Sequence, residues 1–265
     1  LCLPELDSKE RRRLLRGSLI ETGKTHLEVG AMWLWPLEKL EHLQERVEGA
    51  ESLEGVLARG KGALLLIPHL GNWEFINVHQ TPGHEWAAIY RPPRLAELEP
   101  TIRQARERSG AALAPASAAG IRLLYRCLRE GGLAIVMPDQ EPVESGGRFV
   151  PFFGLPALTM TLVPRLLRRT GAAAVFGYAL RGDRGGFTMH FEEASSELAD
   201  EDLDRALAAL NRGIERCVRA APEQYQWGYK RFKTRPPGEL TPYRVRGRPK
   251  RVTQAINERL RRQRR

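Results

Sequence analysis

Three runs of consecutive apolar residues limit most strongly how this chain can fold. They are GALLLIPH at 62–69, LAIVMPD at 133–139 and AAAVFGYAL at 172–180. A strand that is apolar on both faces has to be covered on both faces, as in a parallel sheet with helices on each side. Because stretches with helical periodicity separate the runs, the sequence predicts an α/β fold with a central, mostly parallel or mixed sheet covered by helices.

Helix caps and turn residues mark other elements of the predicted fold. Asp7 with Glu10 three residues later forms a capping box, which predicts an N-terminal helix. The glycines and aspartate of GDRGG at 182–186 predict a tight hairpin turn. The apolar segment FVPFFG at 149–154 predicts a rigid loop. We expect further strands at 85–91 and 186–193, and helices near 38–59 and over 95–110, 118–132, 160–171 and 200–222.

Composition excludes several classes of protein. The 265 residues are 42% hydrophobic and 28% charged, which allows a substantial core and is not typical of a disordered chain. The longest uncharged stretches are shorter than the roughly 18 apolar residues that a membrane-spanning helix needs. The three cysteines are far apart and form no CxxC pair, which argues against a disulfide framework or a zinc knuckle and favours a reducing compartment.

The length suits one catalytic domain at 1–240, whose N-terminal part at 1–60 is helical, followed by a polybasic tail at 241–265. Residues 244–265 contain ten Lys or Arg and one acid, so a net +9 of the total +10 lies there and +1 remains for the rest of the chain. The tail could bind nucleic acid, anionic lipid or a phosphorylated glycolipid, or could simply be solvated. The nearly neutral body has no recognisable nucleic-acid-binding motif, which counts against nucleic acid as a partner.

The segment IPHLGNWE contains the strongest candidate for a reaction centre. His69 ends the first apolar run, and Glu74 follows five residues later, just after Asn72, a candidate helix N-cap. An imidazole can take a proton from an attacking hydroxyl, and it does so better when a carboxylate holds its other nitrogen. His69, Arg91 and Asp139 all stand at predicted strand ends, where ligands gather in such sheets, so we expect them to share a site.

A metal site is the competing interpretation of the histidines. His69, Glu74, His79 and His84 are spaced by five residues. Steps of five rotate by about 140° on a helix and do not collect ligands on one face, unlike the i, i+4 spacing of a zinc-binding helix. The breaker TPG at 81–83 also interrupts any continuous helix. We therefore expect no metal.

Several segments in a fixed order resemble one family. HLGNWE at 69–74 resembles the HX4D/E motif of the glycerolipid and lipid A acyltransferases. The first fifteen residues, YRPP, PDQ, RFVPFFGLPALT, RRTGAA and PEQYQWGYKRFKTRPPGE are similar to segments of the bacterial lipid A biosynthesis acyltransferase family. The resemblance runs from Leu1 to about Glu239 and implies a glycerolipid-acyltransferase-like fold.

The resemblance also implies a reaction and roles for single residues. These enzymes move a fatty acyl chain, usually from acyl carrier protein, to a hydroxyl on a lipid A precursor. His69 matches the general base and Glu74 its relay partner. Asp139 could act on the substrate directly, or it could position Arg91 or Arg106. Arg148 could bind substrate or form a surface ion pair. The residues expected to bind substrates are Asn72, Arg91, Arg106, Asp139, Gln140 and Arg148.

The implied partners are acyl carrier protein, a phosphorylated glycolipid and the cytoplasmic face of the bacterial inner membrane, with acyl-ACP or acyl-CoA as co-substrate and no further cofactor. Members of the family usually begin with a hydrophobic anchor. Because this chain starts at Leu1 and shows none, we expect the anchor to have been removed or to be absent, and the protein to be peripheral. Another acceptor, such as a phosphatidylinositol mannoside or an ornithine lipid, stays open, as does anionic-surface or nucleic-acid binding by the tail.

Overall fold

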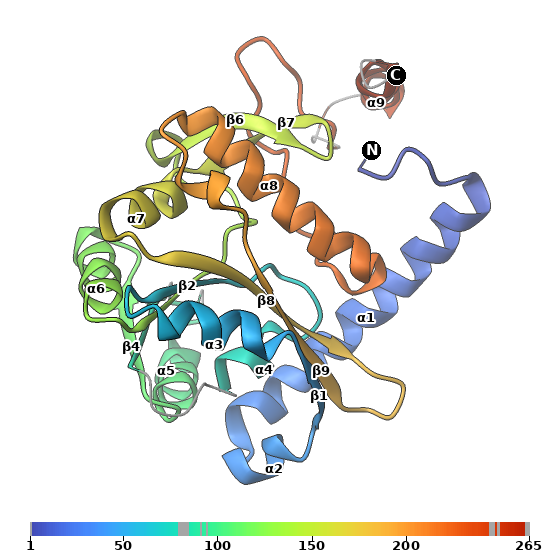
Figure 1. Cartoon of the computed structure of the whole chain (residues 1–265). Helices are drawn as coiled ribbons and strands as arrows, with labels where there is room; N and C mark the ends of the chain where they lie inside the picture. The colour runs from blue at the N-terminus through green and yellow to red at the C-terminus, as the bar shows by residue number, and fades with distance from the viewer. Residues whose placement is uncertain are drawn as a thin grey trace.

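The computed structural model describes residues 2–78, 85–90, 92–93, 95–243, 247 and 250–262. Within them, seven strands form one sheet in the order β1-β9-β8-β2-β5-β3-β4 (Figure 1). The pair β8–β9 is antiparallel, and every other neighbouring pair is parallel. The sheet strands are Gln44–Glu48 (β1), Ala63–Leu66 (β2), Trp86–Tyr90 (β3), Ala111–Pro115 (β4), Leu133–Val136 (β5), Ala173–Arg181 (β8) and Phe187–Glu193 (β9). This confirms the predicted α/β class.

Helices cover both faces of this sheet (Figure 1). The α-helices are Ser8–Leu34 (α1), Leu37–Glu41 (α2), Ala50–Ala58 (α3), Trp73–Val78 (α4), Glu99–Glu107 (α5), Ala118–Arg129 (α6), Leu162–Thr170 (α7), Leu203–Ala220 (α8) and Lys250–Arg262 (α9). Short 3₁₀ turns lie at Ala96–Leu98, Glu144–Gly146, Ser196–Ala199 and Pro222–Gln224.

The core has two parts, one on each face of the sheet. In β2, Leu64 and Leu66 pack on the side of α6, α7 and α8, whereas Leu65 packs on the side of α1, α3 and α4. Successive side chains of a strand point to opposite faces, so a continuous apolar run supplies both parts at once. All four residues of β2 and of β5 are buried, which explains why the central strands lack a polar face.

The predicted caps are present. The Asp7 side chain accepts hydrogen bonds from the backbone N–H groups of Lys9 and Glu10, and the Glu10 side chain accepts from the backbone N–H of Asp7. At the start of α8, the Asp202 side chain accepts hydrogen bonds from the backbone N–H groups of Asp204 and Arg205. The GDRGG segment turns between β8 and β9, where Gly182 N–H donates to the Gly186 carbonyl. Local sequence therefore determined these helix starts and this turn.

The sequence-based prediction misses three features of the sheet region. The segment 38–59 contains strand β1 between two helices, and β4 follows α5 directly. The apolar segment predicted as a loop forms an antiparallel hairpin, with strands Gly147–Phe152 (β6) and Leu155–Met160 (β7). β1 reads QERVE and has no apolar face, so its strand conformation depends on pairing with β9.

A buried arginine joins α1 to the sheet. Arg181, at the end of β8, donates to Glu28 Oε1 at 2.6 Å, to Glu21 Oε2 at 3.0 Å and to Thr25 Oγ1 at 2.6 Å. Its side chain is 7% exposed. Paired charges at such a site are costly to separate, because removing one partner leaves the other buried and unpaired. The two carboxylates therefore hold α1 in a defined position against the sheet.

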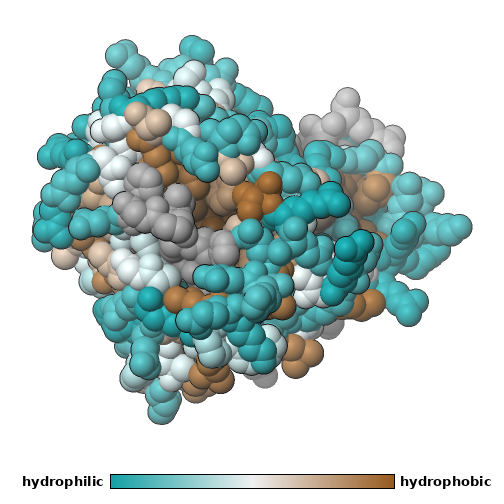
Figure 2. Space-filling model, turned by 60° about the horizontal axis from the view of Figure 1, so that its bottom comes forward, coloured by the Kyte–Doolittle hydropathy of each residue, from teal (hydrophilic) through white to brown (hydrophobic). Residues whose placement is uncertain are grey.

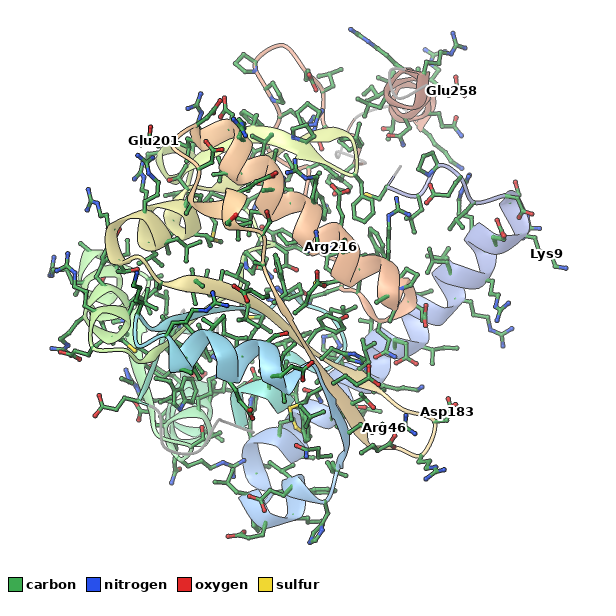
Figure 3. The ribbon with its side chains drawn as sticks, in the orientation of Figure 1. Lys9, Arg46, Asp183, Glu201, Arg216 and Glu258 are labelled. Atoms are coloured by element: carbon green, nitrogen blue, oxygen red, sulfur yellow. The ribbon has the colours of Figure 1, made fainter. Side chains whose placement is uncertain are left out.

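The C-terminal segment packs on the body within its described residues. Helix α9 places Leu260 in the core at 7% exposure, and Ile256 packs against the same apolar cluster. Figure 3 shows Glu258 on this helix, on the same side of the view as Lys9 at the start of α1.

The surface in Figure 2 is mostly hydrophilic, and hydrophobic residues form separate patches on it. Among the described residues, none of the helices combines the length and the apolar character that crossing a bilayer requires.

Only glycine fits at position 71, where the loop after β2 packs against the backbone of β8. Gly71 has φ +61°, and a Cβ at this position would fall on the carbonyl oxygen of Ala179. We expect Gly71→Ala to lower the free energy of unfolding by more than about 2 kcal/mol. Urea denaturation measures this change. Gly23→Ala on α1 is the matched control, because its Cβ meets open space and should change stability by less than about 1 kcal/mol, in the stabilising direction. Equal effects of the two substitutions would contradict the interpretation.

Candidate active site

Parallel pairing brings two distant residues to the same edge of the sheet. In β2 and β5, Leu66 is the register partner of Val136. His69 stands three residues after the end of β2, and Asp139 stands three residues after the end of β5. The segments that follow β2 and β5 therefore leave these neighbouring strands at the same level, and the side chains of His69 and Asp139 meet. The expectation that His69 and Asp139 share a site agrees with this geometry.

Asp139 holds His69 through two hydrogen bonds. Its Oδ1 lies 2.7 Å from His69 Nδ1, and its Oδ2 accepts from the His69 backbone N–H at 2.8 Å. The Asp139 side chain is 2% exposed. Burial by itself would raise the pKa of this carboxyl. The charge of the neighbouring His69 and the hydrogen bonds that the carboxylate accepts have the larger combined effect and lower the pKa. Asp139 is therefore a carboxylate at neutral pH.

The ionised carboxylate determines which nitrogen of His69 is available. A carboxylate can only accept hydrogen bonds, so Nδ1 carries the proton and Nε2 has the free lone pair. Nε2 lies 3.0 Å from Gln140 Nε2, whose amide can donate to it. The imidazole ring also packs against Trp73, with ring centroids 5.1 Å apart. The ring is thus fixed in the tautomer and orientation that a general base requires.

The loop that carries His69 is attached on both sides. The His69 carbonyl accepts from Gln226 N–H, the Gly71 N–H donates to the Gln224 carbonyl, and the Asn72 N–H donates to the Ala179 carbonyl. These bonds engage two of the backbone N–H groups just before α4 and hold the loop in place.

The Asn72 side chain forms hydrogen bonds within the protein at both ends of its amide. Its Oδ1 accepts from the Phe75 N–H at 3.1 Å, which confirms it as the N-cap of α4. Its Nδ2 donates to Glu28 of α1 at 3.0 Å, and the residue is 1% exposed. Both ends of the amide are engaged within the protein, so Asn72 links the loop to α1 and is not presented to a substrate.

Glu74 faces a different partner from the one expected. Its carboxylate forms a bidentate pair with Arg106 of α5, in which Arg106 Nε lies 3.1 Å from Oε2 and Nη2 contacts Oε1. Glu74 is 3% exposed and Arg106 is 22% exposed. The Arg106 guanidinium also lies over the Tyr90 ring, 5.3 Å from its centroid. The carboxylate hydrogen-bonded to His69 is that of Asp139, so the expectation that Glu74 orients His69 does not fit these contacts. Nor does Asp139 brace Arg106.

Arg148 is not brought to His69. Arg148 lies in β6, with half of its side chain exposed, and pairs with Asp204 of α8 at 3.0 Å. This is the surface ion pair that the sequence left open as an alternative. Arg91 lies outside the described residues, as do His79 and His84.

Tyr225 is a part of the site that sequence analysis missed. It is 5% exposed and pairs with Leu70 through an isolated β-bridge. Burial, the charge of Asp139 and a side-chain hydrogen bond with it raise the pKa of Tyr225 well above its ordinary value. The only signal for it was its place in the aromatic and cationic segment YQWGYKRFK, which gave no indication of a contact with Asp139.

Comparison with known proteins identifies the family. The family model described as bacterial lipid A biosynthesis acyltransferase matches residues 1–234. The chain is 28% identical over 245 residues to the lipid A biosynthesis palmitoleoyltransferase of Escherichia coli (strain K12), covering 92% of this chain and 79% of that protein. It is 29% identical over 250 residues to the lipid A biosynthesis lauroyltransferase of the same strain, with the same coverage. A lipid A biosynthesis acyltransferase of Haemophilus influenzae is 29% identical over 251 residues, covering 91% of this chain and 77% of that protein.

The family match extends over most of the chain and includes His69, Asp139 and the segment around Tyr225. The resemblance noted in the sequence is thereby confirmed. This chain belongs to the bacterial lipid A biosynthesis acyltransferase family, and as such it is an O-acyltransferase.

Proposed function

We propose that this protein transfers a fatty acyl chain from the thioester of acyl carrier protein to a hydroxyl of a phosphorylated lipid A precursor, at the cytoplasmic face of the inner membrane. The observation that carries the proposal is the His69–Asp139 hydrogen bond, which leaves Nε2 as the basic nitrogen at the edge of the sheet. Membership of the family supports the acceptor class.

The reaction would proceed with His69 as both base and acid. Nε2 takes the proton of the acceptor hydroxyl as its oxygen attacks the thioester carbon, and a tetrahedral oxyanion forms. The C–S bond then breaks, and the departing thiolate takes the proton back from the imidazolium. Asp139 stabilises the imidazolium and keeps Nδ1 protonated. The Gln140 amide lies beside Nε2 in this structure. When the acceptor hydroxyl takes that position as the hydrogen-bond partner of Nε2, the amide can donate to the hydroxyl oxygen instead.

An apolar cavity supports the acyl part of the proposal. A cavity of about 290 Å³ lies between the start of α1, the hairpin residue Phe152 and the segment around Tyr225. Tyr225 belongs both to the wall of this cavity and to the surroundings of Asp139. A fatty acyl chain needs such a sheltered apolar space close to its reacting carbonyl.

Replacing His69 should slow acyl transfer strongly while leaving the fold intact. We expect His69→Ala to lower the rate of acyl transfer by about a thousandfold, because the base is lost. Mass spectrometry of a tetra-acylated phosphorylated precursor, incubated with acyl-ACP of several chain lengths in detergent, would detect a product heavier by one acyl group. His190→Ala is the control, since His190 lies in β9 and pairs with Glu48 at 3.1 Å.

The same experiment should include acyl-CoA as donor and mannosylated or ornithine lipids as acceptors. Product with one of these alone would move the protein to that substrate class. Full activity of a folded His69→Ala protein would exclude His69 as the base.

Two carboxylates compete for the role of orienting His69, and substitution separates them. We expect Asp139→Asn to lower kcat by about a hundredfold to ten-thousandfold, because an amide neither fixes the tautomer nor stabilises the imidazolium. Glu74→Gln should act mainly through Arg106 and should raise KM more than it lowers kcat. The reverse pattern, with kcat lost in Glu74→Gln and kept in Asp139→Asn, would assign the relay to Glu74.

The lowered pKa of Asp139 predicts a pH dependence of stability. A carboxyl whose pKa is lower in the folded state stabilises the fold above its unfolded pKa of about 3.9, and this contribution disappears as the pH falls through the folded value. We expect the difference in unfolding free energy between wild type and Asp139→Asn to be constant above about pH 5 and to shrink below about pH 4. Urea denaturation at several pH values measures it. A difference that grows on acidification would contradict a lowered pKa.

A further inference from the structure

The outward side of α1 is unusually apolar for a surface helix. Leu27 is 84% exposed, Leu34 is 70% exposed and Leu19 is 67% exposed, and Ile20 is half exposed. Single exposed leucines are ordinary on soluble proteins, but a row of them along one helix marks an interaction site. We call this surface the outer face of α1, and it consists of Arg12, Arg13, Arg16, Leu19, Ile20, Leu27 and Leu34.

Helical geometry shows that these residues form one face. Ser18, Thr25 and Met32 recur every seven residues and are the buried positions of α1. At about 100° per residue, the outer-face residues all fall within about 60° of the direction opposite to these three. The leucines and arginines therefore look away from the sheet together.

The charges of α1 are divided between its two sides. The acids of the helix are Glu10, Glu21 and Glu28. Glu10 completes the capping box, and the other two bind Arg181. All three lie away from the outer face, which carries Arg12, Arg13 and Arg16 and no acid. The outer face is therefore both apolar and positively charged.

We propose that the outer face of α1 lies on an anionic lipid bilayer, with its leucines at the level of the headgroups and its arginines on the phosphates. Apolar residues mixed with arginine are typical of helices that lie in a membrane interface. A second copy of the chain fits this face poorly, because its own outer face would cover these arginines without offering an acid to pair with them. Anionic phosphates neutralise the same arginines.

The biological meaning of this surface rests on the proposed function, because an acceptor embedded in a membrane has to be reached from its surface. Helix α1 is connected both to the loop of His69 and to the apolar cavity, so a membrane under α1 would lie near the candidate site. Glu28 connects the helix to Asn72 in the loop of His69, and to Arg181 in the sheet. The cavity beside Tyr225 is lined by Leu14 and Leu15 from the same helix. Lipid binding can nevertheless be measured without any catalysis.

Cosedimentation with vesicles tests the proposal on the full chain. The vesicles would be phosphatidylcholine alone, or phosphatidylcholine with about one-third phosphatidylglycerol, at about 0.1 M salt, where the Debye length is still near 10 Å.

We expect binding to the anionic vesicles only. Arg12→Gln/Arg13→Gln/Arg16→Gln should weaken it about a hundredfold, at about fivefold for each cation. Leu19→Gln/Leu27→Gln should weaken it by at least about tenfold. Glutamine keeps helix propensity close to that of the replaced residues.

Matched controls use exposed residues elsewhere. Arg205, Arg212 and Arg216 of α8 are exposed and each pairs with an acid, and their triple change to Gln should leave binding unaltered. Leu95→Gln/Leu98→Gln controls for the loss of exposed leucines. Acyl transfer to a detergent-dispersed acceptor should continue in the α1 variants, which separates failure of this proposal from failure of the proposed function.

Three results would overturn the proposal. Wild-type protein could fail to sediment with anionic vesicles. Binding could persist in both α1 variants and be lost in Arg251→Gln/Arg259→Gln/Arg262→Gln, which would place the lipid contact on α9. Light scattering could instead show a dimer in wild type that the leucine changes dissociate, which would make the outer face a subunit interface.

Discussion

The parallel pairing of β2 with β5 is the constraint on which the site depends. Neither strand contributes a catalytic side chain, and both are buried throughout. Their register nevertheless places His69 and Asp139 at matching distances beyond the two strand ends. The backbone hydrogen bond from Ile67 to Val136, at 3.0 Å, extends the pairing one step towards the site. The geometry of the His69–Asp139 pair is thus set by apolar strands that the hydrophobic effect holds at the centre of the protein.

Buried charges around the site act mainly on its architecture. Glu74 and Arg106 join α4 to α5, and Arg181 joins β8 to α1. Each pair is shielded from water, so losing one partner leaves an uncompensated charge and destabilises the local arrangement strongly. The loop of His69 lies between these two connections. Such a loop has little freedom to move, which favours a preorganised base over one that must be assembled on binding.

The proposed lipid contact and the proposed chemistry meet in α1. The inner side of this helix binds the sheet through Glu21 and Glu28, and the outer face presents arginine and leucine to the solvent. The same helix lines the apolar cavity that shares Tyr225 with the site. The hydrogen bonds of Arg181 set the orientation of this helix relative to the sheet.

The sequence by itself determined what depends on near neighbours and on burial: the apolar strands, the caps at Asp7 and Asn72, the turn at GDRGG and the position of His69 just after a strand. Only the tertiary structure decided the partners. His69 and Asp139 are separated by 70 residues, and Glu74 was the nearer carboxylate in sequence but turns to Arg106. β1 and the β6–β7 hairpin were also missed, because their conformation comes from pairing rather than from a local pattern. Local signals act over a few residues, whereas contacts between side chains depend on which strands become neighbours.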